Sequence, residues 1–240
     1  MSLRRLVWVI ALLASSQSVF AAEVDPTQHL TARSDRYDVT WSGIPLGEGE
    51  IRLTPQADGC FLYESTTDPI ALVRWTYGAP KETSQFCVQN GRIISRQFSY
   101  DNDKRENDSF RLDFDWGQKR VKTLRAGEMT LRDLPDQAYD RFVIREAVRM
   151  WVIRNAAGDA PDQAEFVLVN EDRMKSYRFA VIGTESVATP AGTFETIRVD
   201  RIDDPKRPFH YWFAPSRDYI PVKLEHLKKD KVELRMTLLR

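Results

Sequence analysis

One segment constrains the fold more than any other. Residues 136–157 (DQAYDRFVIREAVRMWVIRNAA) contain no glycine or proline and repeat helix-forming residues with a period of about 3.6. Asp136 is a suitable N-cap and Gly158 a suitable C-terminal stop, so we predict one helix from Asp136 to Ala157. Its polar side is a narrow arginine stripe, and apolar side chains fill most of the remaining circumference. Such a helix must be largely buried.

The first half of the chain indicates β-strands. Apolar residues alternate over residues 37–41, and Gly43–Gly47 (GIPLG) are expected to turn the chain into the next strand. Asn90 and Gly91 supply the positive φ values of a type I′ hairpin turn. Residues 68–80, with prolines near both ends, interrupt the alternation and are expected to hold one helical turn. We predict a meander of hairpins here.

The second half returns to strands after the helix. Turn signals recur at the spacing of antiparallel all-β proteins, and the several helices that parallel βαβ units need are absent. The predicted fold is mainly β: one domain over residues 36–240, in which a curved antiparallel sheet, a barrel or half-barrel, wraps around one long α-helix. The later strands are expected over residues 110–116, 120–129, 165–171, 174–187, 193–202, 209–215, 220–229 and 232–240.

The N-terminus has the three parts of a secretory signal peptide. Arg4 and Arg5 precede a short apolar run, and Val19-Phe20-Ala21 is a small-x-Ala cleavage site. The run is too short to span a bilayer, and no cysteine stands at the cleavage point for lipid attachment. We therefore expect residues 1–21 to be cleaved, residues 22–35 to be a flexible mature N-terminus, and the protein to be periplasmic, with no transmembrane segment after cleavage.

Charge and motifs exclude several functions. Removal of residues 1–21 takes away two arginines and no acidic residue, which leaves 33 basic against 35 acidic groups. Nucleic acid is disfavoured as a partner, because its binding needs basic patches. No nucleophile elbow, Walker loop or dinucleotide turn is present, so we expect no cofactor and favour a non-enzymatic protein. A carboxylate pair for glycan cleavage, assembled by the fold, stays an alternative.

The two cysteines, Cys60 and Cys87, both lie on predicted strands. In an oxidising compartment they are expected to form a disulfide. Two free buried thiols are the alternative, because pairing does not follow from sequence alone.

Candidate binding residues are the arginine stripe and the aromatic residues near the C-terminus. Arg141, Arg145 and Arg149 share one helix edge and could hold an oxyanion, because guanidinium suits planar bidentate contacts. We favour the alternative that the stripe is the solvated edge of the helix. Trp212 could contact a sugar or a lipid chain, although alternating aromatic residues in a β protein mostly form core.

Two histidines raise the question of a metal. If the hairpin turned symmetrically about Asp218, His210 and His226 would lie opposite each other. A single bulge would separate them, and neither has a neighbouring ligand motif. We therefore expect no metal site.

Three motifs together resemble a known family. Residues 37–47 (YDVTWSGIPLG), 190–196 (PAGTFET) and 212–225 (WFAPSRDYIPVKLE) are similar to the signature segments of an exported bacterial family, domain of unknown function 3108. The resemblance covers nearly the whole mature chain. It implies a periplasmic β-rich domain and brings no established activity and no catalytic residues.

These expectations favour a periplasmic binding or carrier protein, without enzymatic activity, for an amphipathic envelope molecule, either a lipid or a glycan. This inference uses fold-level analogy with envelope carriers of acyl chains. An alternative is an envelope assembly or interaction factor that has a protein partner and no small-molecule pocket. A glycan hydrolase is the third hypothesis.

Overall fold

The computed structural model describes residues 24–240, so the expected signal peptide over residues 1–21 lies outside the described part. The strands of the N-terminal half are β1 (Arg33–Trp41), β2 (Ile44–Pro55), β3 (Cys60–Pro69), β4 (Lys81–Gln89), β5 (Arg92–Asp101), β6 (Phe110–Asp115), β7 (Arg120–Arg125) and β8 (Glu128–Asp133). Those of the C-terminal half are β9 (Tyr139–Asp140), β10 (Gln163–Val169), β11 (Met174–Thr189), β12 (Gly192–Arg201), β13 (Phe209–Ala214), β14 (Ile220–Lys228) and β15 (Lys231–Leu238). The helical segments are α1 (Ala71–Thr76), α2 (Ile144–Ala156) and the short 3-10 turns η1 (Pro26–His29), η2 (Ala57–Gly59), η3 (Glu106–Asp108) and η4 (Pro215–Arg217).

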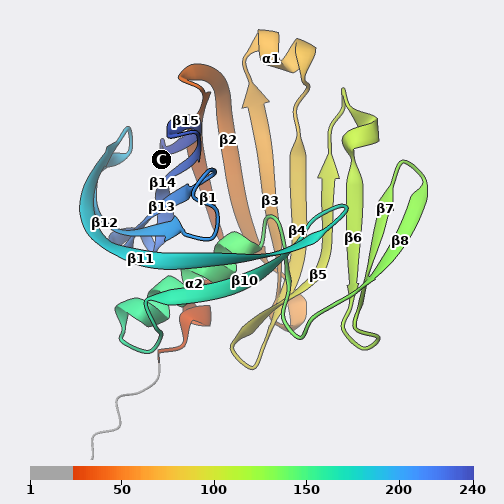
Figure 1. Ribbon diagram of the computed structural model, residues 1–240. Helices are drawn as coiled ribbons and strands as arrows, with labels where there is room; N and C mark the ends of the chain where they lie inside the picture. Colours follow the sequence, from red (N-terminus) through yellow and green to blue (C-terminus); the bar gives the residue numbers. More distant parts are fainter. Residues whose placement is uncertain (1–23) are drawn as a thin grey trace, which may run out of the picture.

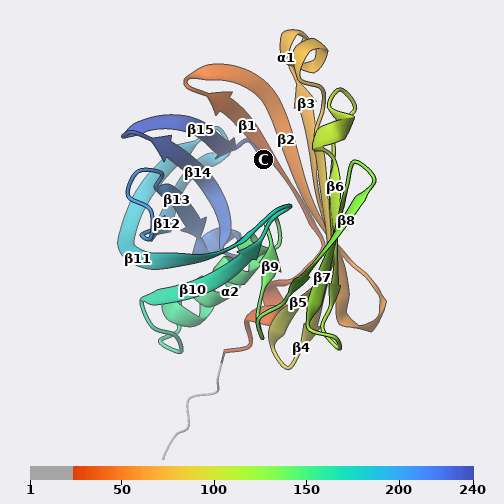
Figure 2. The same cartoon turned by 45° about the vertical axis from the view of Figure 1, so that its right-hand side comes forward.

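All described strands belong to one 15-stranded sheet in the order β8-β7-β6-β5-β4-β3-β2-β1-β15-β14-β13-β12-β11-β10-β9. Neighbours are antiparallel, as predicted, except for the two-residue parallel pair of β9 with β10. The sheet curls strongly without closing, and β8 and β9 are its edges (Figures 1 and 2). The protein is therefore mainly β, as the alternation of apolar residues predicts.

The helix differs from its prediction. Instead of Asp136–Ala157, α2 begins at Ile144, because Tyr139 and Asp140 pair with β10 and the Asp140 carboxylate caps the following turn. Nine of its 13 residues are buried, so the expectation of burial holds. In both views α2 lies at one end of the curled sheet and α1 at the other (Figures 1 and 2). A sheet wrapped around one long helix is not confirmed.

Glycine allows two tight hairpin turns and one close approach of neighbouring strands. Asn90 and Gly91 form the predicted hairpin turn, with φ of 50° and 70°. The first turn is shorter than predicted: Trp41 pairs with Ile44, so Ser42 and Gly43 alone reverse the chain. Gly47 lies within β2 at a φ of 126°, where a Cβ would meet the Asp68 carbonyl oxygen at 2.3 Å. That close approach of β2 and β3 admits only glycine.

The N-terminal segment packs against the helix and the sheet, and a disulfide links two neighbouring strands. Residues 24–35, expected to be flexible, pack against the fold: Leu30 is buried and Arg33 forms an ion pair with Glu146 of α2. Cys60 and Cys87 face each other across β3 and β4 and form the predicted disulfide. Residues 68–80 hold α1, as predicted.

Candidate functional site

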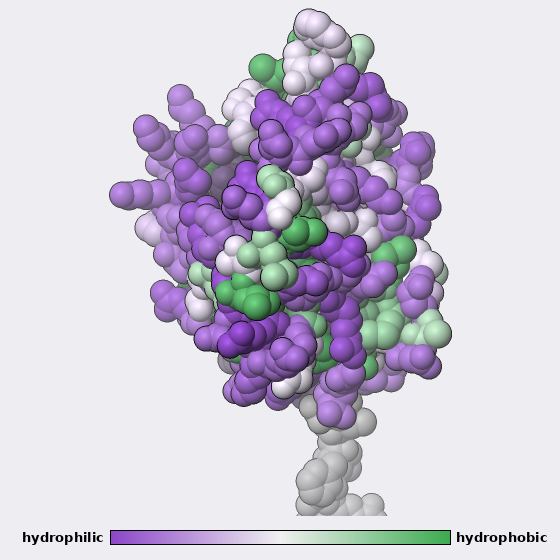
Figure 3. Space-filling model, turned by 90° about the vertical axis from the view of Figure 1, so that its right-hand side faces the viewer, coloured by the Kyte–Doolittle hydropathy of each residue, from purple (hydrophilic) through white to green (hydrophobic). Residues whose placement is uncertain are grey.

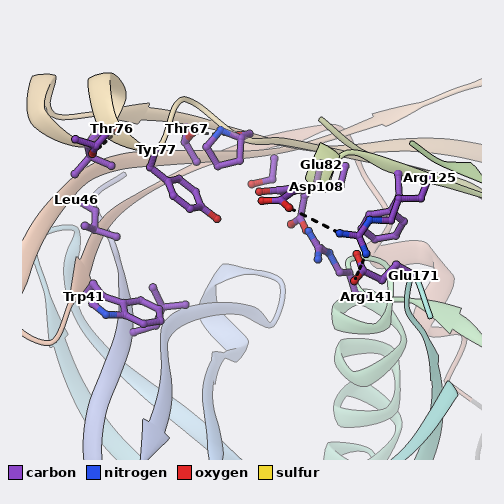
Figure 4. Close-up of a pocket in the computed structure, with 16 residues that line it drawn as sticks. Trp41, Leu46, Thr67, Thr76, Tyr77, Glu82, Asp108, Arg125, Arg141 and Glu171 are labelled. Atoms are coloured by element: carbon purple, nitrogen blue, oxygen red, sulfur yellow. Dashed lines mark hydrogen bonds and ion pairs between the residues drawn. The ribbon is translucent and has the colours of Figure 1, made fainter. Parts of the chain in front are cut away.

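A cavity of about 770 Å³ opens at the end of the curled sheet that carries α1. Strands β1 to β5, the start of β6, the end of β7 and β15 contribute to its wall, together with α1, η3, the turn before α2 and the β10–β11 turn (Figure 4). Its size lies within the range of small-molecule sites, roughly 300–1,000 Å³. We therefore take it as the candidate site.

The lining divides into an apolar side and a charged side. Trp41, Leu46 and Tyr77 lie on one side of the cavity, with the Tyr77 hydroxyl directed inward (Figure 4). Arg141 and Arg125 lie on the other side with their carboxylate partners (Figure 4). This separation suits a ligand with one apolar and one polar part.

Arg141 is held at the base of the charged side. Its Nε donates to Glu82 Oε1 of β4 over 2.7 Å, and its guanidinium carbon lies 4.5 Å from the Tyr100 ring centre and 5.2 Å from that of Phe110. Buried Asp140 fixes the backbone beside it, by accepting hydrogen bonds from the next turn. The sequence offers Arg141 as a candidate oxyanion-binding residue, and in the structure this side chain lines the cavity.

Arg125 bridges the two halves of the sheet. Its Nη1 lies 3.2 Å from Glu171 Oε1, in the β10–β11 turn, and its Nη2 lies 3.8 Å from Asp108 Oδ1, before β6. The partners come from segments far apart in the chain, so these ion pairs hold opposite edges of the open sheet near each other. The cavity wall is closed by side chains at this point, where the strands do not pair.

Tyr100 and Tyr77 add hydroxyl groups to the lining. Burial and a hydrogen bond with Tyr77 raise the pKa of Tyr100 to about 12. The phenol therefore stays neutral at physiological pH and can both donate and accept hydrogen bonds.

A smaller hollow lies deeper along the same strands. Every second residue of a strand faces the same side. On β1, Trp41 lines the cavity and Tyr37 lines the inner hollow; on β3, Ser65 lines the cavity and Tyr63 lines the inner hollow. Arg145 lines this inner hollow, and its guanidinium donates a hydrogen bond to the Tyr211 hydroxyl. Arg145 thus lies one helical turn beyond Arg141, toward the closed end of the interior.

Arg149 lies away from the cavity and corrects the interpretation of the stripe as a solvated edge. Its side chain is fully buried and donates to Glu146 Oε2 at 2.8 Å, to the Asp218 carbonyl at 2.8 Å and to the His29 carbonyl at 2.9 Å. Arg33 pairs with the same carboxylate. Burial of the arginine is tolerated because a buried partner and two carbonyls satisfy it.

Trp212 also lies outside the cavity. It is buried beneath charged side chains: its indole N–H donates to Glu185, and Lys223 Nζ lies 4.2 Å from the ring centre. The neighbouring Tyr211 faces the interior instead. Alternation along β13 therefore directs Trp212 to the outer face.

The two histidines do not meet. His210 pairs with Glu225, and His226 with Phe209, because the hairpin turns about Arg217, with Ala214 opposite Ile220, and the register shift between Trp212 and Phe213 makes up only part of the difference from a turn centred on Asp218. His210 Nδ1 lies 2.6 Å from Asp200 Oδ1. Within residues 24–240, no group of three potential metal-ligating side chains is assembled.

Most cavity residues escape prediction from the sequence. Glu82, Arg125 and Tyr77 come from separate elements and share no local motif. Trp41 is an exception in part, since it belongs to the 37–47 segment that carries the family resemblance.

Nothing in the region described by the structure is a helix of sufficient length and apolarity to cross a membrane.

Comparison with known proteins shows a family and a fold. A family model described as "Protein of unknown function (DUF3108)" matches residues 36–238. A β-barrel-like protein of domain of unknown function DUF1849 from Brucella abortus is similar in structure, with a TM-score of 0.55 at 13% identity over 88% of this chain and 97% of that one. LprF from Mycobacterium bovis aligns with a TM-score of 0.29 at 13% identity, over 89% of this chain and 87% of that one. No curated protein matches the sequence.

Proposed function

The chain belongs to the DUF3108 family, whose description leaves its activity open, and on that premise we propose a periplasmic, non-enzymatic binding or carrier protein for an amphipathic envelope lipid. The observation that carries the proposal is the cavity of about 770 Å³ with its apolar and charged sides. The signal-peptide pattern over residues 1–21 and the Cys60–Cys87 disulfide support the location, because disulfides persist in oxidising compartments.

The charges of the cavity base favour a ligand with an anionic group. Within the described residues, Glu82 is the one carboxylate that forms an ion pair with Arg141, and Arg145 is also close enough to interact with Glu82 electrostatically. Two guanidinium groups therefore share one carboxylate. Only Nε of Arg141 is used by Glu82, so its terminal N–H groups can donate to a phosphate or carboxylate.

An interaction factor is the second candidate, and one surface favours it. Edge strand β8 has no neighbour beyond it, and Met129 and Leu131 on this strand are exposed. Unpaired edges are templates for an added strand.

For the glycan hydrolase, the cavity carboxylates Glu82, Asp108 and Glu171 are each paired with an arginine, and nothing favours one of them as the proton donor.

The test is displacement of an apolar fluorescent probe, N-phenylnaphthylamine, by lipids extracted from a bacterial envelope. Wild-type protein is expected to bind the probe saturably and to release it to the lipids. Thr67→Trp places an indole in the cavity, whereas Thr66→Trp puts the same group on the exposed side of β3. We expect Thr67→Trp to lose probe binding and Thr66→Trp to keep it.

Circular dichroism and thermal unfolding of both variants control for folding. Probe binding that is not saturable, or that is equal in Thr67→Trp and the wild type, contradicts the proposal. Native mass spectrometry of protein taken directly from the periplasm separates the two candidates, because a carrier retains a lipid mass and an interaction factor retains a protein.

A further inference from the structure

Five large apolar side chains are exposed at the end of the molecule that carries the cavity mouth. We call them the apolar tip: Trp41 and Ile44 at the β1–β2 turn, and Ile70, Leu72 and Trp75 in and before α1. Leu72 is 67% exposed and Trp75 77% exposed, and their i, i+3 spacing puts both on one side of the helix. Figure 3 shows weakly polar and apolar atoms gathered at this end.

The tip and the cavity are built from the same short segments. Within α1, Val73 lines the cavity while Leu72 and Trp75 do not. Trp41 belongs to both surfaces: it lines the cavity and is 43% exposed. A molecule leaving the cavity by its mouth therefore passes directly along the tip.

Charge and size indicate what the tip contacts. Arg74 is the one charged residue of α1, and it pairs with Asp68 at 3.1 Å, so contact with an apolar medium leaves no isolated charge at the centre of the tip. Five side chains are too few for a stable protein interface, which takes about 20–30 residues a side. Tryptophan is the residue type that favours the boundary between water and lipid, because its ring is apolar and its N–H is polar.

We propose that the apolar tip docks on a lipid bilayer, with α1 and the β1–β2 turn inserted at the level of the headgroups. The cavity mouth then faces the membrane surface, and an amphipathic ligand moves between bilayer and cavity without crossing water. The docking step stands apart from the proposed carrier function. The transfer step rests on that function.

Vesicle co-sedimentation tests the docking. Wild-type protein, lacking residues 1–21, is mixed with vesicles of phosphatidylethanolamine and a minor share of phosphatidylglycerol. The double variant Leu72→Ser/Trp75→Ser is expected to partition at least about tenfold more weakly, because partitioning scales with the apolar area inserted. The matched control is Met129→Ser/Leu131→Ser, which removes residues 63% and 51% exposed on β8. It is expected to bind as the wild type does.

Two further readouts, the salt dependence of vesicle binding and probe binding without vesicles, decide between explanations. Binding that persists in high salt supports insertion, and binding abolished by salt overturns it, because surface charge is screened. Absent vesicle binding, or equal binding by the tip variant and the wild type, overturns the docking proposal. Probe binding in vesicle-free solution should be unchanged in the tip variant, so loss of the carrier function is distinguished from loss of docking.

Discussion

Asp140 is a buried carboxylate at the point where the chain passes from β9 into the turn that holds Arg141 in the cavity. Its oxygens accept hydrogen bonds from the backbone N–H groups of Phe142 and Val143, each at 2.8 Å, and from the Ser84 hydroxyl at 2.5 Å. Burial raises the pKa of Asp140 to about 6, from an ordinary value of 3.8, although these hydrogen bonds act in the opposite direction. The shift makes the folding stability depend on pH.

The sign follows from proton uptake. Between about pH 4 and pH 6 the folded protein holds a proton on Asp140 that the unfolded chain has lost, so this group stabilises the fold most at low pH. That contribution is complete below the unfolded pKa and is lost as the pH rises through about 6. A difference of about two pKa units corresponds to about 3 kcal/mol. Asp140→Asn does not titrate, while its amide oxygen can still accept from the backbone.

The assay is urea unfolding of the wild type and Asp140→Asn over a pH series, followed by tryptophan fluorescence. We expect the stability of the wild type relative to Asp140→Asn to fall by about 3 kcal/mol between about pH 4 and pH 7. Ser84→Ala removes a hydrogen bond that lowers the pKa of Asp140, so the midpoint of this fall should move to higher pH. A flat difference, or one that rises with pH, would refute the assignment of burial as the dominant cause.

Three other experiments test the packing. Glu146→Ala leaves the buried Arg149 and the partly buried Arg33 without their shared carboxylate and should destabilise the protein by about 3–5 kcal/mol in urea unfolding. An unchanged unfolding midpoint would show that these ion pairs contribute little. Replacing Cys60 and Cys87 by serine should cost about 3–4 kcal/mol, and reductant should lower wild-type stability equally. Gly47→Ala should destabilise by at least about 2 kcal/mol, more than Gly43→Ala, whose Cβ would meet nothing within 4 Å. Equal melting temperatures for the two glycine variants would contradict this.

Local patterns predict the strands and turns because both depend on near neighbours. The alternation over residues 37–41 and the Asn90-Gly91 turn correspond to β1 and to the β4–β5 hairpin. The start of the helix escapes this reasoning. Tyr139 and Asp140 have apolar and capping neighbours suitable for a helix, but their backbone pairs with Leu168 and Val169, which only the folded sheet brings near.

The arginine stripe shows the same limit for charged side chains. An unpaired buried charge is rare, so a solvated edge is the natural expectation for Arg149. Its burial depends on Glu146, visible three residues earlier, and on two backbone carbonyls, those of His29 and Asp218, that no local pattern brings near. Arg141 differs because its carboxylate partner is Glu82 of β4, and the pair lines the cavity.

The two ends of the curled sheet differ in how their polar groups are satisfied, and this difference favours one route for the proposed ligand. At the α2 end, Arg149 and Glu146 are fully buried and bonded to protein atoms. Opening that end would expose or unpair charges, which is expensive. At the base of the cavity, Arg141 keeps its terminal N–H groups beside the open space, and at the α1 end Trp75 is exposed to solvent. Entry past α2 would break this packing, so under the proposed function we expect the ligand to enter past α1 and the apolar tip.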